Sequence, residues 1–213
     1  MAKEASGWEH IYRQSPAHQD REIPHEDVES LHRLFHKNGA RRVLDLGCGN
    51  GRHLVYFASL GYGVCGLDYA PTALRLAGKW LAERRLSAEM ACADMTAIPF
   101  RSGSFDAVIS FQVINHGTLD DIRRTTGEIH RILRDDGWLF VMVGGCRPPG
   151  PLHFRNGHEI EPGTYLLTDH LESGIPHHFF TTTELLDNYS RFKIIDLHWD
   201  SRSRACLLAQ KRD

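Results

Sequence analysis

The chain contains 213 residues, enough for one well-buried domain, and its 25 basic side chains nearly balance its 27 acidic ones. The net charge is −2, whereas a dedicated nucleic-acid binder usually has an excess of basic residues. No apolar run approaches the ~18 residues of a membrane span, and the first 16 residues do not have the basic-then-apolar pattern of a signal peptide. Five cysteines, an odd number with no CxxC pair, predict neither a disulfide framework nor a zinc ribbon, so we expect a reduced, cytoplasmic protein.

From residue 24 onward, apolar strand-like segments alternate with segments of helical periodicity. Helices are expected at residues 24–39, 51–61, 71–85, 118–137 and 181–190, and strands at 41–47, 62–68, 88–94, 105–113, 138–145, 192–200 and 205–212. Thr118 with Asp121, and Thr181 with Glu184, have the spacing of helix capping boxes. Residues 146–180 show little periodicity and are expected to be irregular.

This alternation predicts an α/β fold, a Rossmann-like doubly wound sheet of seven strands. The sheet should be mostly parallel, but only residues 200–204 separate the last two strands, which therefore should form an antiparallel C-terminal hairpin. Ligands of such sheets bind outside the carboxyl ends of the strands. The notable polar and glycine-rich segments all fall at such ends, at residues 45–51, 68, 94 and 112–117.

The first of these segments, VLDLGCGNGRH at residues 43–53, runs from a strand into three closely spaced glycines. A phosphate-binding P-loop is excluded because Arg52 and His53 follow Gly51 where that motif needs Lys and Ser or Thr. The dinucleotide-binding motif GxGxxG is less favoured, since Arg52 occupies the position of its third glycine. S-adenosylmethionine, which has no phosphate, is the third candidate.

The segment resembles the first motif of class I S-adenosylmethionine-dependent methyltransferases, which combine a hydrophobic strand, an acidic residue and GxGxG. The resemblance continues through GVCGLDYAPTAL, ACADMTAIPF, FDAVISFQVINHG and EIHRILRDDGWLFVMV, in the order of that family, and covers roughly residues 40–145. It implies an S-adenosyl-L-methionine cofactor. The glycines would then leave space for the methionyl moiety, with the Asp45 carboxylate balancing its ammonium group.

The resemblance also implies roles for the later strand ends. Asp68 would accept both ribose hydroxyls, and Asp94 with Met95 would contact the adenine. The full set of predicted cofactor contacts is Asp45, Gly47, Cys48, Gly49, Asp68, Tyr69, Asp94, Met95, Phe111 and Gln112.

Each of these residues also has a purely structural interpretation. Glycine-rich turns are often only turns, Asp68 could cap the helix that begins near Pro71, and Asp94 could hold a loop. Tyr69 and Phe111 could be core residues as well as stacking partners for adenine.

The acceptor side is predicted from the remaining segments. His116 and His178 are candidates for taking a proton from the substrate, with pocket lining as the alternative. We expect residues 1–213 to form one domain with two segments that cover the substrate side as a lid. These are an N-terminal segment, residues 1–23, and a substrate-side insertion, residues 146–180. The lid residues expected to face the substrate are Trp8, Tyr12, His177 and Phe179. The histidines at 153, 158, 170, 177 and 178 match no compact ligand motif, so no metal is predicted.

These features favour a methyltransferase acting on a small molecule. The [DN]PP[YF] motif of amino-methylating DNA enzymes and the Pro-Cys dipeptide of cytosine-ring enzymes are both absent, and the charge disfavours nucleic acid. We expect no membrane partner, and the oligomeric state stays open. A non-catalytic S-adenosylmethionine-binding regulator and a nicotinamide-dependent oxidoreductase remain as alternatives.

Overall fold

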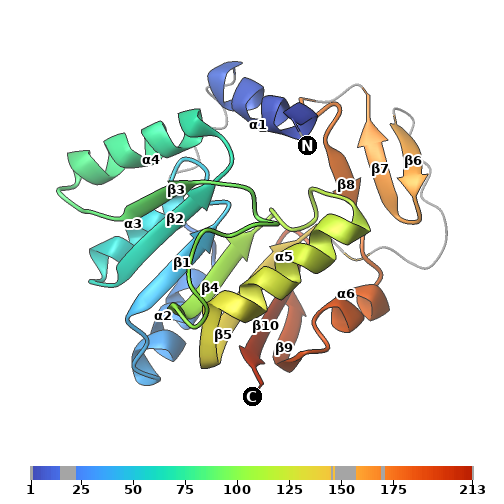
Figure 1. The fold of residues 1–213 in the computed structure, drawn as a ribbon. Coiled ribbons are helices and arrows are strands. Elements are labelled where there is room, and N and C mark those ends of the chain that lie inside the picture. The colour runs from blue at the N-terminus through green and yellow to red at the C-terminus, as the bar shows by residue number, and fades with distance from the viewer. Residues whose placement is uncertain (1, 15–22, 145, 147–156, 169–170, 213) are drawn as a thin grey trace.

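The computed structural model describes residues 2–14, 23–144, 146, 157–168 and 171–212 (Figure 1). Seven strands form one sheet in the order β3-β2-β1-β4-β5-β10-β9. The strands are β1 (Arg42–Leu46), β2 (Gly63–Asp68), β3 (Glu89–Cys92), β4 (Phe105–Phe111), β5 (Leu133–Val143), β9 (Phe192–Trp199) and β10 (Ala205–Lys211). Neighbours pair in parallel except at β10, which is antiparallel to both β5 and β9. The predicted fold class, with its antiparallel C-terminal hairpin, is confirmed.

Helices cover both faces of this sheet. They are α2 (Val28–Lys37), α3 (Arg52–Ser59), α4 (Pro71–Glu83), α5 (Leu119–Ile132) and α6 (Thr182–Asn188). Both predicted capping boxes are present: the Thr118 hydroxyl accepts from the Asp121 amide at 3.3 Å, and the Thr181 hydroxyl accepts from the Glu184 amide at 3.2 Å. Each box satisfies amides that the first helical turn leaves without partners, which fixes where α5 and α6 begin.

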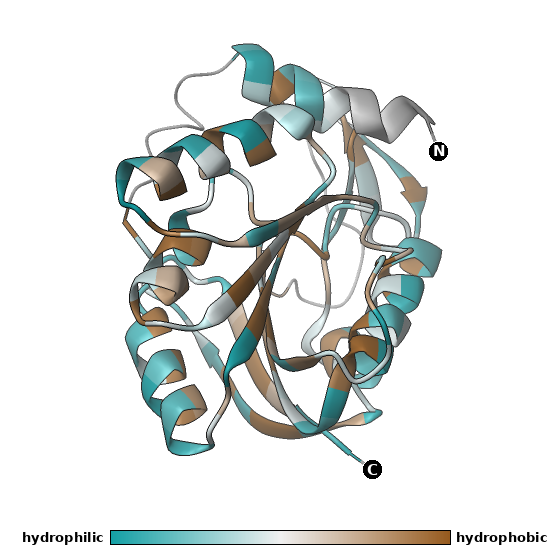
Figure 2. Cartoon of the chain, turned by 60° about the vertical axis from the view of Figure 1, so that its left-hand side comes forward, coloured by the Kyte–Doolittle hydropathy of each residue, from teal (hydrophilic) through white to brown (hydrophobic). Residues whose placement is uncertain are grey.

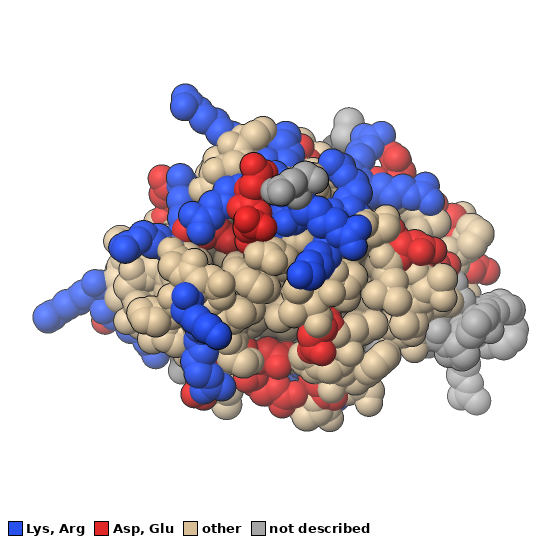
Figure 3. Space-filling model, turned by 90° about the horizontal axis from the view of Figure 1, so that it is seen from below, with Lys and Arg blue, Asp and Glu red and all other residues tan. Residues whose placement is uncertain are grey.

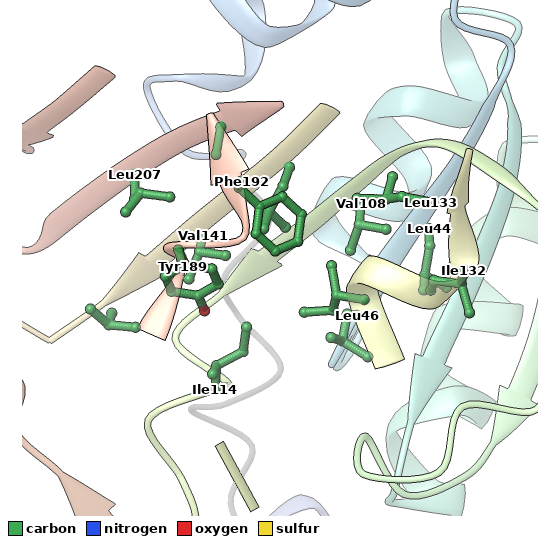
Figure 4. Close-up of a cluster of buried hydrophobic side chains, with 14 of the residues drawn as sticks. Leu44, Leu46, Val108, Ile114, Ile132, Leu133, Val141, Tyr189, Phe192 and Leu207 are labelled. Atoms are coloured by element: carbon green, nitrogen blue, oxygen red, sulfur yellow. The ribbon is translucent and has the colours of Figure 1, made fainter. Parts of the chain in front are cut away.

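The two faces of the sheet bury two separate hydrophobic clusters. On one side, Leu44 and Val108 of the sheet pack with α5 and with Tyr189 and Phe192 near α6 (Figure 4). On the other, Val43 packs with apolar residues of α2, α3 and α4. Figure 2 shows the hydrophobic residues concentrated in the strands and on the helix sides that face them. This two-sided burial explains why the central strand β4 is buried at all seven positions.

Residues 157–178 contain a second sheet that the sequence did not predict. β6 (Gly157–Glu161), β7 (Thr164–Leu167) and β8 (Pro176–His178) form a small antiparallel sheet in that order. Pro162 and Gly163, the latter at φ +79°, turn the chain between β6 and β7. The expectation of an irregular segment was wrong here, because β6 is largely exposed and lacks a clear apolar alternation.

The N-terminal segment forms α1 (Ala2–Gln14), which lies across the carboxyl ends of the strands between α4 and β8 (Figure 1). The Glu9 carboxylate accepts hydrogen bonds from the Thr72 amide at 2.9 Å and the Thr72 hydroxyl at 2.7 Å, at the first turn of α4. On the opposite side, a Cβ added to Gly7 would come within 3.0 Å of Ile175. Residues 15–22 and 147–156, which belong to the predicted lid segments, lie outside the described residues.

The face turned away from α1 carries Lys and Arg interspersed with Asp and Glu (Figure 3). Among the described helices, none is both long and apolar enough to cross a membrane.

Candidate functional site

A cavity of about 410 Å³ opens at the carboxyl ends of the parallel strands, beneath α1. Its wall contains fourteen of the predicted site residues: Trp8, Tyr12, Gly47, Cys48, Gly49, Asp68, Tyr69, Asp94, Met95, Phe111, Gln112, His116, His177 and Phe179. Asp45 and His178 are not part of the wall. Residues from six separate parts of the chain therefore meet here, and the volume suits a small organic ligand.

The glycine loop is fixed by the strand beside it. The amides of Gly47 and Cys48 both donate to the Leu67 carbonyl of β2, at 2.7 and 2.9 Å. Gly47, at φ +70°, has no room for a side chain, since an added Cβ would lie 2.2 Å from Val113. At Gly51, with φ +93°, an added Cβ would lie 2.8 Å from the Cβ of Ala77 in α4. The fold itself thus requires two of the glycines, a reason that the sequence alone did not reveal.

Gly49 differs because it faces the underside of α1. Its φ is +54°, and an added Cβ would lie 2.5 Å from the Tyr12 hydroxyl. Of the three loop glycines, Gly49 is therefore the one at which an added Cβ would meet α1.

Asp68, the last residue of β2, is held from two directions. One carboxylate oxygen accepts from the Gly49 amide at 2.8 Å and the other from the Ala70 amide at 2.9 Å. Burial raises the pKa of Asp68, and the backbone hydrogen bonds oppose that shift by stabilising the charged form. Each oxygen keeps a lone pair for a further donor, so the carboxylate can receive two hydroxyls from the cavity.

Asp45 is buried within β1, with 1% of its surface exposed, and its Oδ2 has no hydrogen-bond partner among the described residues. Burial raises the pKa of Asp45 to about 7, with Asp68 adding to the shift and Arg52 opposing it. Because the side chain lies outside the cavity wall, its predicted pairing with an ammonium group stays a prediction.

The other predicted cofactor contacts occupy mixed environments. Asp94 accepts from both the amide and the hydroxyl of Thr96 at 2.7 Å, which is the loop-holding role considered above. Tyr69 is 38% exposed, whereas Phe111 belongs to a core cluster and stacks on His53, with ring centroids 3.8 Å apart. Gln112 has a left-handed φ of +55°, uncommon for a residue other than glycine.

The opposite wall comes from α1, the loop after β4 and the segment before β8. The Trp8 ring lies edge-on to His116, with centroids 4.9 Å apart, and His116 lies edge-on to His177 at 4.8 Å. Burial and the neighbouring His177 lower the pKa of His116 to about 4, so its imidazole is neutral at neutral pH. His178 instead hydrogen-bonds to Thr164 of β7 at 2.9 Å, which suits a structural role.

Glu172 and Asn115 are two of the cavity residues that were not predicted from the sequence. Glu172 lies 2.6 Å from His177 through its Oε2 and Nε2, and Asn115 is buried with an Oδ1 that has no hydrogen-bond partner in the described part of the chain. Only the three-dimensional arrangement reveals Glu172, whereas the position of Asn115 directly before His116 at a strand end was a usable signal.

Comparisons with known proteins agree with this geometry. A methyltransferase-domain family profile matches residues 44–141. A protein of Encephalitozoon cuniculi named as a methyltransferase is 30% identical over 72% of this chain and 71% of its own length. A protein of Mycobacterium tuberculosis named as an S-adenosylmethionine-dependent methyltransferase is 32% identical over 70% of this chain and 58% of its own. The chain belongs to the class I S-adenosylmethionine-dependent methyltransferase family.

A solved structure shares the fold of this family member. The Burkholderia thailandensis 1,6-didemethyltoxoflavin-N1-methyltransferase, with 1,6-didemethyltoxoflavin and S-adenosylhomocysteine bound, superposes with a TM-score of 0.73. It is 22% identical and is matched over 100% of this chain and 88% of that one.

The acceptors of the relatives vary. One relative, from Thermus thermophilus, is named a demethylmenaquinone methyltransferase and is 35% identical over 52% of this chain and 50% of its own length. Another, from Schizosaccharomyces pombe, is named an 18S rRNA (guanine-N(7))-methyltransferase and is 37% identical over 38% of this chain and 30% of its own. The chain spans between about a third and two thirds of most such relatives, so membership of the methyltransferase family does not fix an acceptor.

The contact between Gly49 and Tyr12 predicts the effect of adding one methyl group. Gly49→Ala should weaken S-adenosylhomocysteine binding by at least ~10-fold in calorimetry, because the new Cβ displaces the Tyr12 hydroxyl from its place in the cavity wall. Gly61→Ala is the matched control: its φ of +85° imposes a comparable strain of roughly 1–2 kcal/mol, but nothing lies within 4 Å of the added Cβ. Equal losses of affinity in both variants would show that strain, and not the contact with α1, is responsible.

The buried carboxyl of Asp45 predicts a pH-dependent stability. Its folded-state pKa of about 7 lies above the ordinary 3.8, so its contribution to stability is lost as the pH rises through that range. Asp45→Asn removes the ionisation. Relative to wild type, the variant's free energy of unfolding should therefore rise by about 2–3 kcal/mol between pH 5 and pH 8 in denaturant titrations. A difference that does not change with pH would mean that Asp45 ionises normally in the folded protein.

Proposed function

We propose that this chain is an S-adenosylmethionine-dependent methyltransferase that acts on a small-molecule acceptor. The observation that carries the proposal is the position of the Asp68 carboxylate, fixed by two backbone amides in the wall of a cavity that histidines and aromatic rings also line. We treat residues 1–213 as one domain in which α1 and the segment around β8 serve as the cover.

The residues on the sheet side of the cavity suit this cofactor. Asp68 would hold the ribose hydroxyls, and Asp94 with Met95 would lie beside the adenine, as the family resemblance implies. The wall around the glycine loop carries one basic side chain, Arg52, beside the Asp68 carboxylate, and this lack of an excess of positive charge fits a ligand without phosphates. Asn115 brings a buried carbonyl oxygen in need of a donor, and an ammonium or amide of a bound ligand would satisfy it.

The covered entrance favours a small acceptor. Glu9 ties α1 to the first turn of α4, and the His178 amide donates to the Asn115 carbonyl at 2.7 Å, which ties β8 to the loop after β4. A base within folded rRNA could reach the cavity only after both contacts broke. A compact molecule needs a much smaller opening, and aromatic neighbours such as Trp8 and Phe179 suit an acceptor with an apolar ring.

For the proposed reaction, the protein mainly has to hold the two reactants in line and exclude water from them. S-adenosylmethionine supplies a methyl group on a positively charged sulfur, which an acceptor lone pair displaces in line. The residues of this chain would hold the two molecules in that alignment, and α1 would exclude water from them.

The role of Asp68 gives the direct test. Asp68→Ala should weaken S-adenosylhomocysteine binding by about 1.5–3 kcal/mol, or roughly 10- to 150-fold in calorimetry, because it removes a charged acceptor of two hydroxyls. Methyl transfer to a panel of small hydroxy, thiol and amino compounds should fall in parallel.

Asp106→Ala is the matched control, because Asp106 is also buried and accepts two backbone amides, those of Arg41 and Arg42, but lies outside the cavity wall. It should destabilise the fold and leave cofactor affinity unchanged. An Asp68→Ala loss under about threefold, or tighter binding of a nicotinamide nucleotide by the wild type, would refute the cofactor assignment. Cofactor binding without turnover on any acceptor would favour a regulatory role.

A further inference from the structure

The side-chain amide of Gln112 is held in one orientation beside the cavity. Gln112 follows β4 directly and lines the cavity, and its Oε1 accepts from Nη1 of Arg204 at 3.2 Å. A guanidinium can only donate hydrogen bonds, so the oxygen of the amide faces Arg204 and its NH2 group lies at the other corner. Within the described part of the chain, the side chain of Gln112 makes no other hydrogen bond. Two N–H donors are therefore available to a molecule in the cavity.

Arg204 is itself fixed by Asp200, in the turn between β9 and β10. Both Nε and Nη2 of Arg204 lie 2.5 Å from Oδ2 of Asp200, and Nε2 of His25 lies 2.9 Å from the same oxygen. The Asp200 side chain is fully buried. Burial alone would raise the pKa of Asp200, but the hydrogen bonds from Arg204 and His25 lower it below its ordinary range, so the carboxylate is charged. With Nε and Nη2 engaged in this way, Nη1 is the nitrogen that extends to Gln112.

The turn does not need the contact with Gln112 to close. The amides of Arg202 and Arg204 donate to Oδ1 of Asp200 at 2.9 and 2.8 Å, and the Asp200 amide donates to the Arg204 carbonyl at 3.0 Å. Gln112 in contrast has a left-handed φ of +55°, a strained conformation for a residue other than glycine. A strained residue at a cavity, braced by a side chain 92 positions further along the chain, fits a ligand contact better than a turn contact.

The surroundings of Gln112 indicate which ligand group it meets, and here the inference rests on the proposed function. Val113, the next residue, lies against Gly47, where an added Cβ would be only 2.2 Å away. Gln112 is therefore beside the glycine loop, where the cofactor would place its amino-acid end. The carboxylate at that end offers only acceptors, which match the two N–H donors.

We propose that Gln112 donates to the amino-acid carboxylate of the bound cofactor and that Arg204 is the positioning residue that keeps the amide in its donating orientation. Without Arg204, the amide could turn over and present its oxygen to the carboxylate, which would repel it. Asp200 and His25 act one step further back, because they hold the guanidinium in place. The hairpin that closes the sheet thereby contributes to cofactor recognition although Arg204 is not part of the cavity wall.

The test compares two ligands by calorimetry on the full chain: S-adenosylhomocysteine and its decarboxylated analogue, which lacks only the carboxylate. The wild type should bind S-adenosylhomocysteine at least ~10-fold more tightly than the analogue. Gln112→Glu keeps an oxygen toward Arg204 but replaces the N–H donors with a negative charge. It should weaken S-adenosylhomocysteine binding by at least ~10-fold and should not weaken binding of the analogue. If Gln112 served only to brace the turn, this variant would gain an ion pair with Arg204 and bind both ligands as the wild type does.

Arg204→Lys tests the positioning role and keeps a positive charge beside the buried Asp200. Lysine lacks the planar fork that reaches Asp200 and Gln112 together, so binding of S-adenosylhomocysteine alone should fall, by at least ~3-fold. In the Gln112→Leu background, Arg204→Lys should cause no further loss, because Arg204 acts through Gln112. Arg202→Ala is the matched control: Arg202 is an exposed residue of the same turn, outside the cavity wall, and the variant keeps its backbone amide. Thermal unfolding verifies the fold of each variant.

The outcomes separate this proposal from the cofactor assignment. Equal wild-type affinity for the two ligands, or equal losses on both ligands in the Gln112→Glu variant, would overturn the proposal and leave the cofactor assignment standing. A loss in Arg202→Ala that matches the loss in Arg204→Lys would show that distortion of the turn is responsible, and would overturn the role of Arg204. Absence of binding of both ligands to the wild type would overturn the cofactor assignment and this proposal with it.

Discussion

The carboxylate of Asp68 joins the two loops on which the site depends. It accepts one amide from the glycine loop after β1 and one from the turn after β2, and it is buried while doing so. Without it, the amides of Gly49 and Ala70 would lose this partner, at a cost of about 1–3 kcal/mol each. The same carboxylate has lone pairs left for a ligand, so one group both builds the floor of the cavity and receives the molecule that lies on it.

The cover of the cavity depends on a few polar contacts in the same way. α1 packs on the body through Ile11 and is oriented by Glu9, whose carboxylate lies at the N-terminus of α4, where amides need acceptors and the helix dipole favours negative charge. The small sheet of β6, β7 and β8 is tied to the loop after β4 by the His178 amide. These hydrogen bonds help to fix how α1 and the small sheet lie beside the carboxyl ends of the strands.

Sequence reasoning succeeded where structure is decided locally. The strands of the large sheet, the capping boxes of Thr118 and Thr181 and the C-terminal hairpin follow from periodicity and side-chain chemistry within a few residues. One boundary was wrong, since residues 133–137 were expected to end a helix and instead begin β5. It failed where distant segments meet. Gly47 has no room for a side chain because Val113, from a distant part of the chain, lies against it. Likewise, the hydrogen-bond partners of β8 lie in β7 and in the loop after β4. Glu172 carries no signal of its own, since only folding brings it beside His116 and His177.

The most direct test of this account is hydrogen–deuterium exchange of the full chain with and without S-adenosylhomocysteine, followed by mass spectrometry. The account predicts slower exchange with the ligand in three regions: the glycine loop at residues 47–52, α1, and the segment from Glu172 to Phe179. The edge strand β9, which lies outside the cavity wall, should exchange equally in both states. Unchanged exchange in all three regions would contradict the proposed cofactor site, and protection of the loop alone would contradict the role of α1 and β8 as its cover.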